Sequence, residues 1–457
     1  MQPLETFIGQ DKVLQPYTLV LVVAPIDPAI LSTIQQHATA LQIPTFFFHS
    51  IGYYSHFSIN LPPAFPIVET HPEPTATTDL RLLKPWPELS TFAKKKTEGM
   101  ASKNAHDKGH IPYIALLLYY LEQWREKHDG KVPETYKEKQ EFRDAYVRTG
   151  SPDEENFDEA CAAVLKALNP PVPSSSVGEI LNAPEAQNIT AASPPFWVIA
   201  NAIQQFYTQH NELPLPGSVP DMKAQSKDYI ELQNIYKDKA RADAAEVLAS
   251  VRKTEKDTSR SPKLAIDEKE VENFCKGAAH IHLVRGRTFQ VVQAGELPKF
   301  GDRAKAMTFE LSNPESVIKE YIAFLAWDSF VASHTTTSST IGGEGLRVPG
   351  QASEDESSDI DGDTEKLTGI AHKIVDSLIK EAGEHIEDPE YTEIKEGIAK
   401  VCTELARAGG GELHNIASLT GGMVAQEAIK VITKQYVPVD NTCVFDGIAS
   451  RAGVLRL

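Results

Sequence analysis

Four cysteines, Cys161, Cys275, Cys402 and Cys443, are the first candidates for chemistry in this sequence. A thiol can carry a thioester, but it reacts as the thiolate, which needs a nearby cation, a histidine or a helix N-terminus. Three of the cysteines lie in helical patterns and Cys443 lies in a strand pattern, and none has an adjacent histidine. We interpret them as small buried hydrophobic residues and predict no catalytic residue. They form no CxxC pair, so neither a disulfide framework nor a zinc cluster is predicted.

Three other motifs resemble binding sites, but we do not interpret any of them as one. His106 and His110 have the spacing of metal ligands, but they lie in a polar, glycine-containing loop with no cysteine or third histidine near them in the sequence. The glycines of residues 342–345 lack the lysine and the strand-to-helix context of a phosphate loop. Lys94 to Lys96 are interpreted as a solvated loop. The sequence therefore predicts no metal and no cofactor bound by this chain.

The bulk properties narrow the class of protein further. A chain of 457 residues has room for two to three domains. The formal net charge of −18 argues against nucleic-acid binding, which needs a basic face. The longest apolar runs are shorter than the roughly 18 residues of a membrane-spanning helix, so no membrane partner is predicted. Reduced cysteines point to the cytoplasm, the nucleus or both.

One helical pattern near the C-terminus organises the rest of the chain. Its apolar residues recur three or four positions apart, as one buried helix face requires. They are Ile416, Leu419, Met423, Val424, Ala428, Val431 and Ile432. Gly421 and Gly422 interrupt this helix at a cost of about 1 kcal/mol each relative to alanine. We expect such a helix to be buried and to let another backbone approach closely.

Strand patterns at the two ends of the chain predict a single α/β domain. Residues 18–24, 45–49 and 54–61 read as strands near the N-terminus, and residues 442–448 and 453–457 read as strands near the C-terminus. The strand, helix and strand up to residue 49 are half of a doubly wound unit. We predict sheet segments 1–70 and 409–457, with a mainly helical insertion at 71–408. Its residues 333–363 are predicted to be a disordered loop.

Several long segments together resemble one family. They are ETHPEPTATTDLRLLKPWPEL from residue 69, KVPETYKEKQEFRDAY from 131, PDEENFDEA from 152, LPLPGSVPDM from 213, YIELQNIYKDKA from 229 and ELHNIASLTGGMVAQEAIKVITKQYVP from 412. From about Thr18 to Leu457 the chain is similar to the regulatory subunit of the neddylation-activating enzyme. The family is the non-catalytic half of a heterodimeric activating enzyme for a ubiquitin-like modifier.

The resemblance implies a fold and a division of labour. It implies an incomplete Rossmann-like adenylation domain of the ThiF type, split by a helical domain that corresponds to the catalytic-cysteine region. The catalytic partner subunit is expected to bind ATP and magnesium and to carry the thioester cysteine. The present chain is expected to complete the heterodimer and to shape the groove for the modifier. The family has a further half-domain before Thr18, so the first strands of the sheet are expected to be missing here.

Two stretches are the candidates for the partner interface. The first is on the C-terminal helix and comprises Asn415, Ile416, Leu419, Gly421, Gly422, Gln426, Glu427 and Lys430. The second comprises Glu268, Glu272, Arg285 and Arg287. The same residues can equally close the core of their own domain. Two other functions stay open: a free-standing helical adaptor without an activating role, and a self-contained thiol enzyme that uses Cys161 or Cys402.

Overall fold

The computed structural model describes residues 4–10, 13–72, 79–151, 153–334, 346–351 and 359–457. The chain divides into two compact units, of which unit 1 is Met1–Ile67 with Leu283–Leu457 and unit 2 is Val68–His282. The expected insertion at 71–408 is therefore too long, because the chain rejoins unit 1 at Leu283 rather than at residue 409. None of the helices among the described residues is long and apolar enough to cross a membrane.

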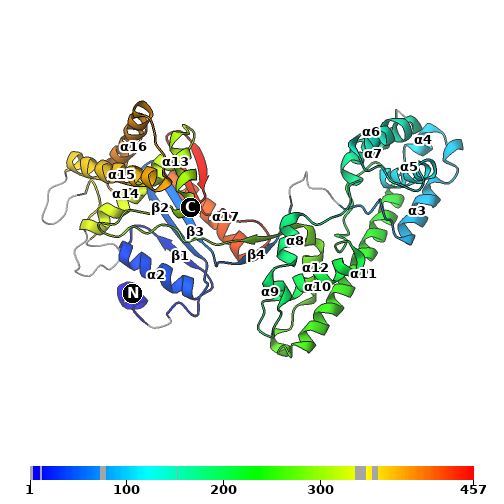
Figure 1. Cartoon of the computed structure of the whole chain (residues 1–457), viewed down its shortest axis with the longest axis horizontal. Coiled ribbons are helices and arrows are strands. Elements are labelled where there is room, and N and C mark those ends of the chain that lie inside the picture. Colours follow the sequence, from blue (N-terminus) through cyan, green and yellow to red (C-terminus); the bar gives the residue numbers. More distant parts are fainter. Residues whose placement is uncertain (1–3, 11–12, 73–78, 152, 335–345, 352–358) are drawn as a thin grey trace. The chain divides into compact units, whose positions relative to one another are not determined.

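Unit 1 is a mixed α/β unit with a five-stranded sheet (Figure 1). The strands are β1 Val20–Val23, β2 Thr45–Ile51, β3 Tyr54–Asn60, β6 Thr442–Asp446 and β7 Arg451–Leu455, in this order across the sheet. Strand β1 pairs with β2 in parallel, and the other pairs are antiparallel. Since β3 pairs directly with β6, the two ends of the chain form one sheet, as the strand patterns predicted.

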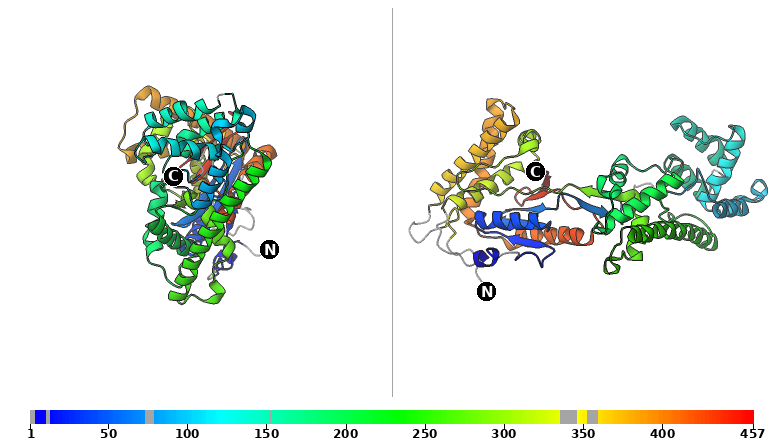
Figure 2. Two further views of the ribbon diagram at one scale, coloured as in Figure 1. Left: turned by 90° about the vertical axis from the view of Figure 1, so that its right-hand side faces the viewer. Right: turned by 60° about the horizontal axis from the view of Figure 1, so that its bottom comes forward.

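One face of the sheet is covered by many helices. They are α2 Pro28–Ala40, α13 Ala304–Ser312, α14 Ile318–His334, α15 Ile360–Ala382 and α16 Asp388–Ala408. The right-hand view of Figure 2 shows α14 to α16, coloured yellow to orange, gathered on one side of the strands. Helix α14 contacts α2, α15, α16 and β6, and its residues form the centre of the main core. This packing is why residues 304–408 belong to unit 1.

The opposite face carries α17, His414–Thr433, which packs on β2 and β3. Val424, Ala428 and Val431 of the helix meet Phe46 of β2 and Phe57 of β3 in a second apolar cluster. Thr420 donates a hydrogen bond of 2.6 Å to Ser55 of β3. One side of α17 is thereby held firmly against the sheet.

The predicted disordered loop at 333–363 is only partly described. Residues 335–345 and 352–358 lie outside the described residues. Between these two gaps, Val348 is buried in the main core and Arg347 forms an ion pair of 2.7 Å with Asp363. Helix α15 begins at Ile360, inside the predicted loop. For the described part, the polar composition was misleading, because a buried ion pair and one apolar contact tie it to the unit.

Unit 2 is helical, as the sequence predicted for this region. Its helices are α3 Pro87–Thr97, α4 Ala105–Lys108, α5 Tyr113–Lys127, α6 Tyr136–Glu141, α7 Glu155–Ala167, α8 Ser175–Leu181, α9 Pro184–Gln187, α10 Pro195–His210, α11 Ser226–Asp257 and α12 Glu268–Lys276. Strands β4 Phe65–Val68 and β5 Ile281–Val284 form a two-stranded sheet where the chain leaves and re-enters unit 1. The short helix α1, Leu4–Ile8, belongs to unit 1.

A half-buried ionisable side chain, Asp328 of α14, lies beside the core of unit 1. It lies at a small internal cavity that His49 and Trp327 also line. Burial raises its pKa from 3.8 to about 7. Because the pKa is higher in the folded chain than in the unfolded chain, this carboxyl group favours folding below about pH 4, and that advantage is lost as the pH rises through 7.

We predict that Asp328→Asn stabilises the protein at alkaline pH. The free energy of unfolding should rise by roughly 2 to 4 kcal/mol at pH 8 and by much less at pH 4, because the uncharged amide avoids the burial of a carboxylate. Urea unfolding at both pH values measures the difference. Asp302→Asn, at a side chain that is 87% exposed, is the control. Equal gains at both pH values would contradict the assignment.

Candidate partner interface

The outward side of α17 carries no charged residue. Ten exposed residues, together with the exposed His414 in the first turn, make up this side: Asn415, Ser418, Leu419, Gly421, Gly422, Ala425, Gln426, Ile429, Ile432 and Thr433. Leu419, Ile429 and Ile432 are exposed to 45%, 58% and 67%. A surface helix of a soluble protein normally turns charged and polar residues outward. We refer to these ten residues as the α17 face, whose composition is typical of a surface that another protein covers.

Three of the predicted interface residues belong to the other side of the helix. Ile416 is buried in unit 1. Glu427 is also buried, and it accepts hydrogen bonds from Lys430 at 2.6 Å and from the backbone N–H of Val439 at 2.8 Å. These contacts secure the segment after α17 to the helix. Ile416 and Glu427 are therefore structural residues of the unit, while Lys430, at the margin, is half-buried.

The helix α17 was expected to be buried and to let another backbone approach closely, but within this chain it is buried on one side only. A Cβ atom built on Gly421 or Gly422 meets no other atom within 4 Å. Leu419 and Ile432, which were assigned to the buried stripe, are exposed. The glycine pair lies instead on the outward side, where it leaves a shallow, side-chain-free stretch of helix. That stretch is open to a partner backbone.

The edges of the sheet extend the same apolar surface. Leu21 and Val23 of β1 are register partners of Phe46 and Phe48 of β2, so they point to the α17 side of the sheet. Both are more than half exposed. At the other edge, Val454 of β7 pairs with Cys443, points to the same side and is also more than half exposed. These residues were not among the predicted interface residues, because an exposed apolar residue in a strand has the same sequence pattern as a buried one.

The second candidate stretch does not form one surface within a single unit. Glu268 and Glu272 are exposed residues of α12 in unit 2. Arg285 and Arg287 belong to unit 1, where Arg287 lies 3.9 Å from Asp440. The boundary between the units passes through the stretch at His282. We therefore base the candidate site on α17 and the sheet edges alone.

The four cysteines were the first candidates for chemistry. All four cysteines are buried. Burial raises the pKa of Cys275 and Cys402 to about 12 and that of Cys443 to about 11, and it also raises the pKa of Cys161. Such thiols hold their protons at neutral pH and make poor nucleophiles.

The two candidate histidines do come together. The rings of His106 and His110 have their centroids 4.5 Å apart, and His110 Nδ1 bonds to the backbone oxygen of His106. Within the described ranges, however, no group of three or more His, Cys, Asp or Glu side chains is arranged to hold a metal ion. The pair is thus a local contact at the end of α4.

Comparison with known proteins identifies the family. No protein-family model matches the chain. The chain is 34% identical over 401 residues to the NEDD8-activating enzyme E1 regulatory subunit of Xenopus laevis, covering 86% of this chain and 68% of that protein. It is 33% identical over 400 residues to the protein of the same name from Danio rerio, with the same coverage. It is 32% identical over 393 residues to the NEDD8-activating enzyme E1 regulatory subunit AXL of Arabidopsis thaliana, covering 85% and 68%. Identities above 30% over more than two thirds of each of these relatives show that the chain belongs to the family of NEDD8-activating enzyme E1 regulatory subunits.

Proposed function

We propose that this regulatory subunit binds the catalytic subunit of the NEDD8-activating enzyme through the α17 face and the flanking sheet edges. The observation that carries the proposal is the outward side of α17, which carries no Lys, Arg, Asp or Glu and exposes Leu419, Ile429 and Ile432 to solvent. Covering it would remove Leu419, Ile429 and Ile432 from water, at roughly 25 cal/mol for each Å² of apolar surface. The glycine pair at its centre would let a partner helix approach closely.

We further propose that the bound chain supports reactions that take place on the catalytic partner. These are ATP-dependent adenylation of the ubiquitin-like modifier and formation of its thioester. Unit 1 would then be a Rossmann-like adenylation domain of the ThiF type, for which the parallel pair β1 and β2, joined by α2, is the supporting feature. Unit 2 would correspond to the catalytic-cysteine region of activating enzymes. The high pKa of each cysteine agrees with a thioester carried by the partner.

The glycine pair provides a matched test of the interface. Replacing Gly421 and Gly422 together by alanine should raise the stability of the isolated chain by about 0.5 to 1 kcal/mol per site, because alanine favours the helix and nothing lies within 4 Å. Replacing both by leucine should leave the fold intact but abolish co-purification with the catalytic subunit. Thermal unfolding and size-exclusion chromatography with the partner measure the two effects.

The outcomes separate this function from that of a free-standing adaptor. If the leucine variant still assembles with the catalytic subunit at the affinity of the unchanged chain, close packing at the glycines is refuted. If the unchanged chain itself fails to assemble with the catalytic subunit and fails to support thioester transfer, the result favours the adaptor role. A thioester trapped on this chain alone, with ATP and modifier, would instead support a thiol enzyme.

A further inference from the structure

Unit 2 contains a cleft of about 720 Å³ that the role described above does not use. Ligand sites commonly measure roughly 300 to 1,000 Å³, so this cleft is large enough for a ligand of several residues. Much of its wall consists of three irregular segments, at residues 79–84, 169–172 and 212–218, and it continues along the C-terminal end of α12. All of these residues belong to unit 2.

Buried polar contacts tie the walls of the cleft to each other. Arg81, which is only 5% exposed and has a φ angle of 54°, forms ion pairs with Asp79 at 2.9 Å and Glu212 at 2.6 Å. Its guanidinium also donates to the backbone oxygen of Leu213. A non-glycine residue in the left-handed region costs energy and is often found at functional sites. Arg81 thereby connects two of the three wall segments.

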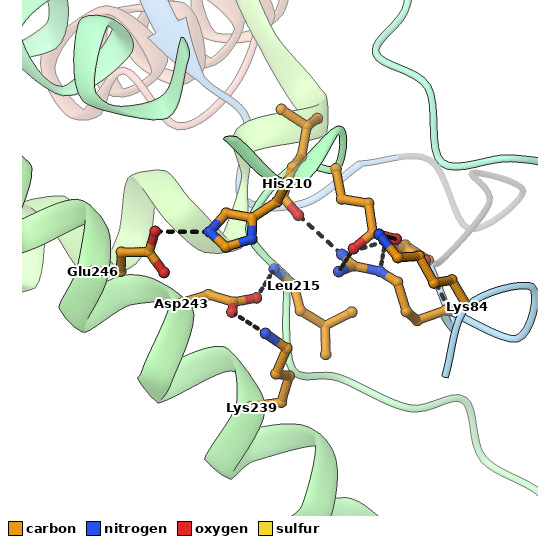
Figure 3. A network of polar contacts seen from close by, with 10 residues as sticks. Lys84, His210, Leu215, Lys239, Asp243 and Glu246 are labelled. Atoms are coloured by element: carbon orange, nitrogen blue, oxygen red, sulfur yellow. Dashed lines mark hydrogen bonds and ion pairs between the residues drawn. The ribbon is translucent and has the colours of Figure 1, made fainter. Parts of the chain in front are cut away.

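A second group of contacts fixes the 212–218 segment to α11 (Figure 3). The buried carboxylate of Asp243 accepts a hydrogen bond of 3.0 Å from the backbone N–H of Leu215. It accepts a second one, of 2.6 Å, from the ammonium group of Lys239. Figure 3 also shows His210 at the end of α10, 2.7 Å from Glu246 of α11. These side chains place the segment on a rigid helix, so the cleft is preorganised.

The lining of the cleft suits an extended peptide chain. Five prolines line it: Pro72, and Pro170, Pro171, Pro214 and Pro216 of the wall segments. Proline has no N–H, so at these positions the wall offers a ligand a backbone carbonyl group but no backbone donor. The half-buried Leu83 and the exposed Val172 add apolar surface. The combination offers contacts for both a peptide backbone and apolar side chains.

The charges of the lining favour an acidic ligand. Each lining carboxylate already has a partner: Glu69 shares a hydrogen bond of 2.9 Å with His282, and Asp79 and Glu212 form ion pairs with Arg81. Three lysines also line the cleft, namely Lys84, Lys166 and Lys276. The side chain of Lys84 is 73% exposed and 4.0 Å from Glu212. The formal net charge of the whole chain is −18, whereas the residues that line the cleft include more cations than anions.

We propose that this cleft binds an extended segment of a partner protein in which carboxylate side chains stand next to apolar ones. The carboxylates would meet Lys84 and Lys276, and the apolar side chains would pack on the prolines and the other apolar residues of the walls. This site lies in unit 2 and is independent of the α17 face, which lies in unit 1.

Selection of random heptapeptides displayed on phage, using the full chain as bait, tests the proposal. The selected peptides should be rich in aspartate, glutamate and leucine. A synthetic version with a fluorescent label should lose about tenfold or more in affinity with the double variant Lys84→Glu and Lys276→Glu, measured by fluorescence anisotropy. Ala279→Trp, at an exposed lining residue, should block the cleft and have a similar effect. Raising the salt concentration should weaken binding to the unchanged chain.

Lys137→Glu, at an exposed lysine that does not line the cleft, is the matched control and should bind normally. All variants should keep their melting temperature and their assembly with the catalytic subunit. Three results would overturn the proposal: selected peptides that bind the cleft variants as well as the unchanged chain, a consensus without acidic residues, or equal competition by inorganic phosphate, which would reveal a site for small anions.

Discussion

Replacing Ile429 by aspartate is expected to abolish assembly with the catalytic subunit of the NEDD8-activating enzyme. Ile429 is 58% exposed in the free chain and stands in the middle of the uncharged side of α17. If a partner covers this position, the new carboxylate is buried without a counter-charge, at a cost of about 3 to 5 kcal/mol. Affinity should fall more than about a hundredfold, which calorimetry or size-exclusion chromatography with the partner will detect.

A matched control distinguishes an interface from a general effect of surface charge. Phe309 of α13 is 74% exposed in the same unit but lies on the helical side of the sheet, away from the α17 face. Phe309→Asp should assemble normally. The isolated Ile429→Asp chain should melt close to the unchanged protein, since the substituted side chain is exposed. Undiminished assembly of the Ile429 variant would exclude the α17 face as the contact surface.

Acid is expected to destabilise the free chain through two buried histidines, His49 of β2 and His56 of β3. The two are register partners, with ring centroids 6.2 Å apart, between the sheet and α14. Burial lowers the pKa of His56 from 6.5 to about 3, and burial with the neighbouring His56 lowers that of His49. Because the folded pKa lies below the unfolded one, the stabilisation is complete above about pH 6.5 and is lost as the pH falls toward 3.

His56→Phe should remove most of this sensitivity at one site. The ring of His56 already packs edge-on against Tyr321 and Phe324, and neither of its nitrogens has a hydrogen-bond partner among the described residues. Protonation of the unfolded chain at pH 5 costs the unchanged protein about 2 kcal/mol at this residue. The variant should therefore gain about 2 kcal/mol more at pH 5 than at pH 8 in urea unfolding.

Asp328 changes stability in the opposite direction over part of the same pH range, so each variant must be compared with the unchanged chain at each pH. His414→Phe, at an exposed histidine of α17, is the control and should show no such difference in gain. A gain for His56→Phe that is independent of pH would mean that His56 is not held neutral by burial.

The local elements and the closure of the chain followed from the sequence alone. Apolar periodicity located α17 and its flanking strands to within a few residues, and the run of β-branched residues located β1. Since a C-terminal helix with strands must join a sheet, the pairing of β3 with β6 was also predictable. Long segments of resemblance were enough to predict the family that the comparisons support.

The tertiary structure decided which unit each helix joins and which side of α17 is left open. Periodicity shows that a helix has an apolar side, but not whether that side packs on other helices or on a sheet, which is why α14 was assigned to the insertion. Similarly, the exposed Ile432 of the α17 face has the same sequence pattern as the buried Val431. Burial depends on neighbours that are distant in sequence, so local patterns cannot reveal it.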